Sequence, residues 1–441
     1  MSVFSNELLL RIFVHLDRRT LRSVALANRT FSRLARTILF SHFAVSRYIT
    51  CLKKHKNDPV SASQLLQLSR YLDFWTSEEI APHVRSCEIS PQRWADDQVA
   101  VPQLLATLFD HIERFAALRR LELSNIQLTG LAVSTLTRLP MLSELLLESC
   151  EVANGDSMPS VSNVLRLCHF LYISKYVSIE GLEEWLPLLE PSVHEFERFQ
   201  DWLPLLEPSC LRVLHTDAAL HISAVIPVFP YVHDLRFTGP IRALSLFLAR
   251  DTLMRIETDD EDSLDDFVIE LQRLPSPLTN LIHLTASFSS SCTATALEAI
   301  FASLPRLEHV QITFAPYAVD RLKPAPAAIL SKLSCIPGIS PHLQLVSLIW
   351  KCLDHVKPRT VDSIESDCDF PAVRAELVAQ CPDLEVLWLD GRDFIFCWHT
   401  QADNMDETEV MVTDPGDVEG VRFGWEALRQ LPHMVYEDDD A

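Results

Sequence analysis

Glycine is scarce in this chain, with 9 residues among 441. Loops that cradle phosphate groups need glycines close together, because only glycine lets the backbone approach the phosphate freely. The chain also contains no Walker loop, no Gly-x-Ser-x-Gly and no His-Glu-x-x-His sequence. We therefore predict that the protein is not an enzyme. A catalytic group assembled only by folding stays open as an alternative, but no motif favours it.

Paired cysteines are missing as well. The chain has 11 cysteines without a single Cys-x-x-Cys sequence, which predicts reduced thiols in apolar positions rather than disulfides. Cys397 and His399 have no second ligand pair at zinc spacing. The carboxylates between Asp259 and Asp266 lack the spacing and central glycine of a calcium loop. We expect neither a metal nor a cofactor.

Positive charge and long apolar runs are also in short supply. Lys and Arg number 38 against 60 Asp and Glu, a net charge of -22, which argues against binding to nucleic acid. No window reaches the roughly 18 uninterrupted apolar residues of a membrane helix. Residues 1–16 lack the basic start of a signal peptide. We expect a cytoplasmic and/or nuclear protein that binds neither nucleic acid nor membrane.

What the chain does contain is a repeated apolar pattern. In its clearest copy Pro140 ends a helix, and Leu142, Leu145 and Leu147 follow on one side of a short strand. The same pattern predicts strands that start at Val84, Leu118, Leu142, Cys168, Val193, Leu211, Val232, Leu253, Leu281, Leu307, Leu343 and Leu384. Their average spacing is about 27 residues, within the range of leucine-rich repeats.

Helical segments alternate with these strands. They are predicted at residues 101–114, 131–139, 241–249, 264–274 and 294–304. Units of strand, turn and helix cannot bury their apolar faces alone, so they stack. We therefore predict an α/β fold in which residues 81–390 form an irregular leucine-rich-repeat-like solenoid, a curved parallel sheet with outer helices. Cys150 fills the consensus position that bonds neighbouring turns, whereas most other repeats lack such a residue.

The first forty residues follow helical spacing instead. They predict three short helices, with Ser5 as the N-cap of the first. Apolar residues on one side of that helix are Leu8, Leu9, Ile12, Phe13 and Leu16. Three helices of this length cannot bury all their apolar side chains, so a partner or a neighbouring domain must cover the remainder.

Residues 3–43 resemble an F-box, most closely those of filamentous fungi. The resemblance lies in the sequence from Asn6 to Asp17, followed by Leu21, Ala25-Leu26, Arg29, Phe31, Leu34-Ala35-Arg36 and Leu39-Phe40. It implies that residues 1–45 dock on the Skp adaptor of a cullin-RING ubiquitin ligase while the rest of the chain captures a substrate. The adaptor-binding residues that it implies are Phe4, Leu8, Leu9, Ile12, Phe13 and Leu16.

The start of the segment departs from the family pattern. Members usually begin Leu-Pro-x-Glu-Leu, whereas this chain has Phe4-Ser5-Asn6-Glu7-Leu8. Phe4 can supply the apolar contact, but loss of the proline removes a stiff helix start, which we expect to weaken adaptor binding. Periodicity alone equally allows a second interpretation, in which these helices are the polar-faced cap of the solenoid.

Two segments flank the predicted solenoid. Residues 46–80 are interpreted as a linker that begins with a lysine-rich polar stretch and contains a helix from Ala62 to Trp75. Residues 391–441 are interpreted as an acidic insertion, a final helix and a disordered tail. Two short apolar runs within the insertion, 394–398 and 410–412, predict a hairpin.

One residue of each strand is predicted to point to the concave side of the sheet, between the second and third apolar positions. Among these residues, the candidate substrate contacts are Tyr172, His215, Arg236, Glu257 and Trp388. A few aromatic and charged anchors typically dominate such surfaces. We predict a non-catalytic substrate-recognition subunit of a Skp-cullin-F-box ubiquitin ligase. The alternative is a leucine-rich-repeat scaffold that binds a protein partner without a ligase.

Overall fold

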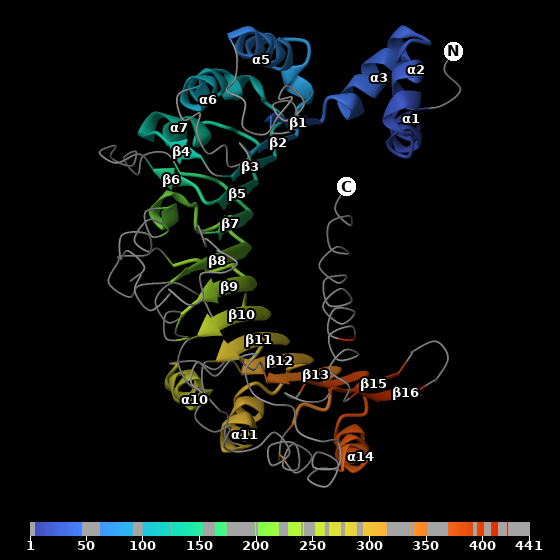
Figure 1. Cartoon of the computed structure of the whole chain (residues 1–441), viewed down its shortest axis with the longest axis vertical. Helices are drawn as coiled ribbons and strands as arrows, with labels where there is room; N and C mark the ends of the chain where they lie inside the picture. Colours follow the sequence, from blue (N-terminus) through green and yellow to red (C-terminus); the bar gives the residue numbers. More distant parts are fainter. Residues whose placement is uncertain are drawn as a thin grey trace. The chain divides into compact units, whose positions relative to one another are not determined.

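The structure is a computed structural model that divides into two compact units, Met1–Tyr231 and Val232–Ala441 (Figure 1). It describes residues 5–45, 62–90, 100–124, 126–152, 164–173, 199, 202–219, 228–239, 241, 252–260, 264–274, 278–288, 294–314, 336, 339–350, 369–390, 395–400, 407–412 and 421. The strands form an open, mostly parallel sheet, which confirms the predicted α/β class.

The first unit begins with three helices and continues with alternating strands and helices. Its helices are α1 (Asn6–Val14), α2 (Arg18–Ala25), α3 (Arg29–Leu39), α5 (Ala62–Trp75), α6 (Ala100–His111) and α7 (Gly130–Leu136), with short 3-10 helices η1 (Ala81–His83), η2 (Ile112–Arg114) and η5 (Leu203–Leu205). Its parallel strands lie in the order β1 (His42–Ala44), β2 (Ser86–Ile89), β3 (Arg120–Ser124), β5 (Glu144–Glu148), β7 (His169–Ile173) and β8 (Val213–Ala219). A separate small parallel pair consists of β4 (Gln127–Leu128) and β6 (Glu151–Val152).

The second unit continues the alternation and ends in a hairpin. Its helices are α10 (Leu264–Arg273), α11 (Ala294–Ser303) and α14 (Phe370–Gln380). Its parallel strands lie in the order β9 (Asp234–Thr238), β10 (Arg255–Asp260), β11 (His283–Phe288), β12 (His309–Phe314), β13 (Leu345–Trp350) and β14 (Val386–Asp390). Two antiparallel strands, β15 (Ile395–Thr400) and β16 (Glu407–Val412), then extend the sheet beside β14.

A row of buried apolar side chains crosses the strands of each unit on the face that the helices cover. In the first unit the register-matched row is Phe43, Cys87, Leu121, Leu145, Phe170 and Leu214. In the second unit it is Leu235, Ile256, Leu284, Val310, Val346 and Leu387. Burial of such rows between strand and helix is the main stabilising contribution to stacked units. We call this side the helix face and the opposite side the second face.

Aromatic contacts show how the helices attach to the helix face. The Phe43 ring of β1 lies 5.0 Å from the Trp75 ring of α5, centroid to centroid. In the second unit the Phe267 ring of α10 meets Phe288 of β11 edge to face at 5.2 Å. Figure 1 shows α5, α6 and α7 along one side of the first unit's strands, and α10, α11 and α14 along one side of the second unit's. The helix predicted from Ala62 to Trp75 is confirmed as α5.

Most predicted strands are confirmed, because every described strand from β2 to β14 overlaps one of them apart from the two-residue β4 and β6. The strand predicted at Val193 lies outside the described residues. In the described part, β7 pairs directly with β8. The three-residue β1 was not predicted, because two apolar residues in a row are too short a pattern to distinguish a strand from a helix end.

The register prediction for β7 is wrong by one residue. The pattern Cys168, Leu171 and Ile173 predicts those side chains on the helix face, yet Phe170 and Tyr172 occupy it, with exposed fractions of 0% and 4%. A shift of one residue moves every side chain of a strand to the other face. The larger rings of Phe170 and Tyr172 bury more apolar area, which favours the observed register.

The hairpin predicted within residues 391–441 is confirmed as β15 and β16. Phe396 of β15 stacks on Phe370 of α14 with ring centroids 5.2 Å apart. Arg374 of the same helix pairs with Glu409 of β16, so α14 contacts both strands of the hairpin. The hairpin tip and the helix predicted at 425–431 lie outside the described residues.

Candidate functional site

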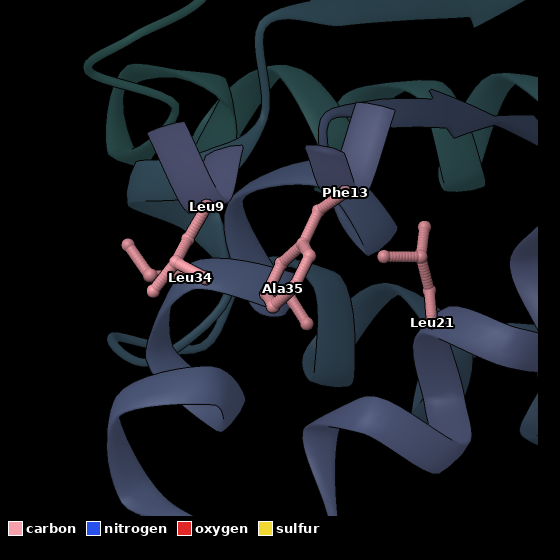
Figure 2. Close-up of a cluster of buried hydrophobic side chains, with 5 residues drawn as sticks. All are labelled: Leu9, Phe13, Leu21, Leu34 and Ala35. Carbon is pink, nitrogen blue, oxygen red and sulfur yellow. The ribbon is translucent and has the colours of Figure 1, made fainter. Parts of the chain in front are cut away.

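Helices α1 to α3 bury a small core of their own. Figure 2 shows its five side chains, Leu9, Phe13, Leu21, Leu34 and Ala35, converging from the three helices. All five are at most 6% exposed, and Phe13 also meets Phe31 edge to face with centroids 5.5 Å apart. These contacts hold the three helices in a defined arrangement, because each helix contributes to the same cluster.

Each of the three helices begins with a side-chain cap. Ser5 accepts a hydrogen bond from the Leu8 amide at 3.3 Å, as predicted. Asp17 accepts bonds from the first turn of α2 at 2.8 and 2.9 Å, and Asn28 accepts one from the Phe31 amide at 2.8 Å. Such caps satisfy amides that a helix start leaves unpaired. Ser5 therefore stabilises the start of α1.

The pKa values of two carboxyls reflect the capping. Hydrogen bonds from the hydroxyl and amide of Thr20 lower the pKa of Asp17. The pKa of Glu7, in the first turn of α1, is lowered chiefly by a hydrogen bond from its own backbone amide. Both groups favour the charged form where the helix dipole also favours negative charge.

The six predicted adaptor-binding residues divide between core and surface. Leu9 and Phe13 are 5% and 4% exposed, so they serve the helical core and offer no surface to a partner. Leu16 is half-buried against the same core. Leu8 and Ile12 are each 44% exposed and lie one turn apart on the same side of α1. Phe4 lies outside the described residues.

Two further exposed apolar side chains of these helices were missed by the sequence analysis. Val14, at the end of α1, is 65% exposed, and Leu26, at the end of α2, is 88% exposed. Single exposed apolar residues are normal. These helices expose Leu8, Ile12, Val14 and Leu26. Val14 does not fit the apolar side of α1, and Leu26 adjoins a helix end, so helical periodicity did not select them.

The second face of the first unit is lined by charged side chains at its centre. Arg120 lies between two glutamates, with nitrogen–oxygen distances of 3.8 Å to Glu122 and 3.7 Å to Glu144. His42 and Glu88 approach to 3.7 Å. Burial raises the pKa of Glu122, and the nearby charge of Glu88 raises it further, although Arg120 acts in the opposite direction. Ion pairs as exposed as these contribute little to stability.

The second face of the second unit changes from exposed to buried along the sheet. Arg236 is exposed and pairs with Glu257 across β9 and β10, with 3.4 Å between nitrogen and oxygen. At the matching position of the next strands, Thr285 is half-buried and Gln311 is 6% exposed. Ser347 and Trp388 then fall to 0% and 2%. The surface that this unit offers at that position therefore lies mainly on β9 to β11.

Trp388 is buried in an apolar cluster on the second face. It packs with Ile395, and four half-buried residues surround the two: Ile349, Cys397, Val412 and Val421. We call this set the Trp388 cluster. Burial raises the pKa of the Cys397 thiol to about 11. Val421 lies beyond the end of β16 in the sequence, so the cluster joins a strand of the sheet to the C-terminal part of the chain.

Comparisons with known proteins assign no family to this chain. Neither a scan against protein-family models nor a search of curated proteins gives a match for this chain. Within the described ranges, no helix is long and apolar enough to cross a membrane. In the same part of the chain, no three or more His, Cys, Asp or Glu side chains gather in a group that could hold a metal ion.

The predicted substrate contacts divide in a similar way. His215, Arg236 and Glu257 lie on the second face and reach solvent at least in part, as predicted. The placement of Tyr172 is wrong, because it lies on the helix face; Leu171 takes the position beside His215. Trp388 lies on the predicted face but is covered, so it is not available as a surface anchor in this state.

Proposed function

We propose that this chain is the substrate-recognition subunit of a Skp-cullin-F-box ubiquitin ligase. In this proposal α1 to α3 form the F-box, and the alternating strands and helices form an irregular leucine-rich-repeat-like solenoid. The observation that carries the proposal is the exposure of Leu8 and Ile12, one turn apart on a helix whose other side is locked into a core. Apolar side chains held rigidly at the surface suit a constitutive protein contact.

The arrangement of the strands supports the solenoid part of the proposal. Within each unit successive parallel strands pair in chain order, apart from the small β4 and β6 pair. The Cys150 thiol lies 3.1 Å from the carbonyl oxygen of Leu123, which links the turn after β5 to β3. Bonds between neighbouring turns are what the consensus residue of a leucine-rich repeat supplies, and Cys150 was predicted to supply one.

The proposed mechanism is tethering. The adaptor would hold the helical end of the chain, and the second face of the sheet would hold a protein substrate. Binding both at once raises the concentration of the substrate beside the ubiquitin-carrying enzyme of the same complex. On this proposal the chain itself forms and breaks no covalent bond.

The test is binding of the full-length chain to a purified Skp adaptor, measured by calorimetry. The test variant combines Leu8→Asp and Ile12→Asp, which leave the core residues Leu9 and Phe13 unchanged. Leu131→Asp is the matched control, since Leu131 is 65% exposed on α7. We expect the wild type and the control to bind and the double variant to lose affinity at least about a hundredfold, as for central interface residues.

Circular dichroism and thermal unfolding must first establish that all three proteins are folded. Absence of binding by folded wild type would exclude the ligase proposal and leave the alternative of a repeat scaffold. Equal loss of binding in the Leu131→Asp control would show that the effect does not come from α1.

A further inference from the structure

The Trp388 cluster differs from the first unit's second face because a side chain from outside the sheet, that of Val421, packs against it. Val421 packs against Trp388 and Ile395, while the matching positions in the first unit, Glu122 and Leu146, are half-buried. Val421 follows β16 by nine positions in the sequence and belongs to no described strand. A residue from outside the sheet therefore covers the second face at Trp388.

Ser347 marks the same place with a polar group. It is the register partner of Trp388 and is 0% exposed. Its Oγ has no hydrogen-bond partner among the residues that the structure describes. A buried hydroxyl without a partner is unfavourable, and a ligand that offers a hydrogen-bonding group would remove that cost. The Trp388 cluster and the neighbouring Ser347 thus place an apolar contact beside a hydroxyl that has no partner among the described residues.

We propose that the Trp388 cluster is a binding position for a branched aliphatic side chain of a protein substrate, and that Val421 occupies this position within the same chain. The inference rests on the proposed function, in which the second face holds the substrate. The occupant in the resting protein is Val421, and the substrate is a peptide segment that places valine or isoleucine against Trp388 and a backbone polar group near Ser347. A substrate must displace Val421, so its apparent dissociation constant is the intrinsic one divided by the fraction of molecules in which the position is free.

Cys397 provides a direct measure of this occupancy. It is the register partner of Trp388 and is half-buried in the cluster, and burial raises the pKa of its thiol to about 11. Alkylation requires an accessible thiolate, so a half-buried thiol with a raised pKa reacts slowly. Cys381, at the end of α14, is the internal control, since it is buried outside the cluster and its pKa is likewise raised to about 11, mainly by burial.

The first experiment compares iodoacetamide labelling of full-length wild type, Val421→Asp and Val421→Ile, with each cysteine followed by peptide mass spectrometry. We expect Val421→Asp to label at Cys397 about tenfold faster or more, because a charged side chain does not remain against Trp388. Cys381 should keep its rate, and Val421→Ile should behave as wild type. Equal Cys397 rates in wild type and Val421→Asp would overturn the proposal. A rise at both cysteines would overturn it too, because Val421 would then be an ordinary core residue.

The second experiment adds a synthetic peptide with the sequence of residues 415–427 to the Val421→Asp protein. The peptide should slow labelling of Cys397 again, and the same peptide with aspartate in place of its valine should not. Absence of protection would exclude a binding position for a ligand supplied from outside. Neither experiment involves the adaptor, so failure of adaptor binding and failure of this inference are distinguishable.

Discussion

The second face of the sheet has the same strand pattern in both units but different surroundings. In the first unit the middle positions of β2 and β3 are glutamates that reach solvent, and they interact with Arg120 and His42. In the second unit the corresponding positions of β13 and β14 are Ser347 and Trp388, both almost fully buried. The strand pattern determines which face a side chain points to. Whether that face meets water depends on what else the chain places there.

The largest expected difference between the two units is the loss of stability when the middle residue of a strand on the second face is replaced by alanine. Trp388→Ala should lower the free energy of unfolding of the second unit by about 3–5 kcal/mol, because it leaves a cavity in the Trp388 cluster. Leu146→Ala, at the half-buried position in the first unit, should cost about 1 kcal/mol or less. Urea unfolding of the full-length variants measures both values. Similar losses would show that the Trp388 cluster is not a core.

Two buried serines on the second face, one in each unit, should differ by a smaller free energy of unfolding. Ser124 is 2% exposed and donates to a Glu148 oxygen at 2.9 Å, whereas the Ser347 hydroxyl has no partner within the described residues. Ser124→Ala should therefore cost about 1 kcal/mol. Ser347→Ala should be neutral or slightly stabilising, because it removes a polar group rather than a bond. Urea unfolding of the two variants checks the order, and a larger loss for Ser347→Ala would contradict it.

The smallest effect concerns charge on the first unit. The pKa of Glu122 is raised in the folded state, so the fold binds the protonated carboxyl more favourably than the unfolded chain does. This contribution to stability is complete below the pKa of the unfolded chain and is lost as the pH rises through the pKa of the folded protein. Glu122→Gln should match wild type near pH 3.5 and be more stable at pH 7, by about 0.5 kcal/mol or less after solvent screening. Unfolding measured at both pH values tests this.

The matched control for Glu122→Gln is Glu376→Gln, an exposed glutamate on α14, which corrects for the change in net charge. Added salt should reduce the difference further, since the neighbouring charges lie near the surface. A stabilisation that is the same at both pH values would show that the carboxylate charge is not its cause.

The sequence predicted much of the fold because apolar spacing and proline positions are local properties. Helix α5 was predicted with the bounds that it has, and the hairpin of β15 and β16 was predicted from two short apolar runs. The register error in β7 has a cause that is not local. At Cys168 to Ile173 two apolar patterns lie one residue apart, and the packing of Phe170 and Tyr172 decides between them.

The candidate sites were predicted less completely. Periodicity grouped Leu8, Leu9, Ile12 and Phe13 as one apolar side, but the helix core takes Leu9 and Phe13 and leaves Leu8 and Ile12 exposed. That division depends on the crossing of α1 with α2 and α3, which no local pattern contains. Val421 could not be assigned at all, because it lies in an acidic segment without a repeat.

By itself, the sequence determined the alternation of strands and helices, the direction in which most strand side chains point, and the cap at Ser5. These features depend on neighbours a few residues away. Only the tertiary structure decided which of those side chains are covered. Exposure depends on residues far apart in the chain. The packing of Val421 against Trp388 and Ile395 shows how a residue 33 positions after Trp388 covers a place that the strand pattern alone does not predict to be covered.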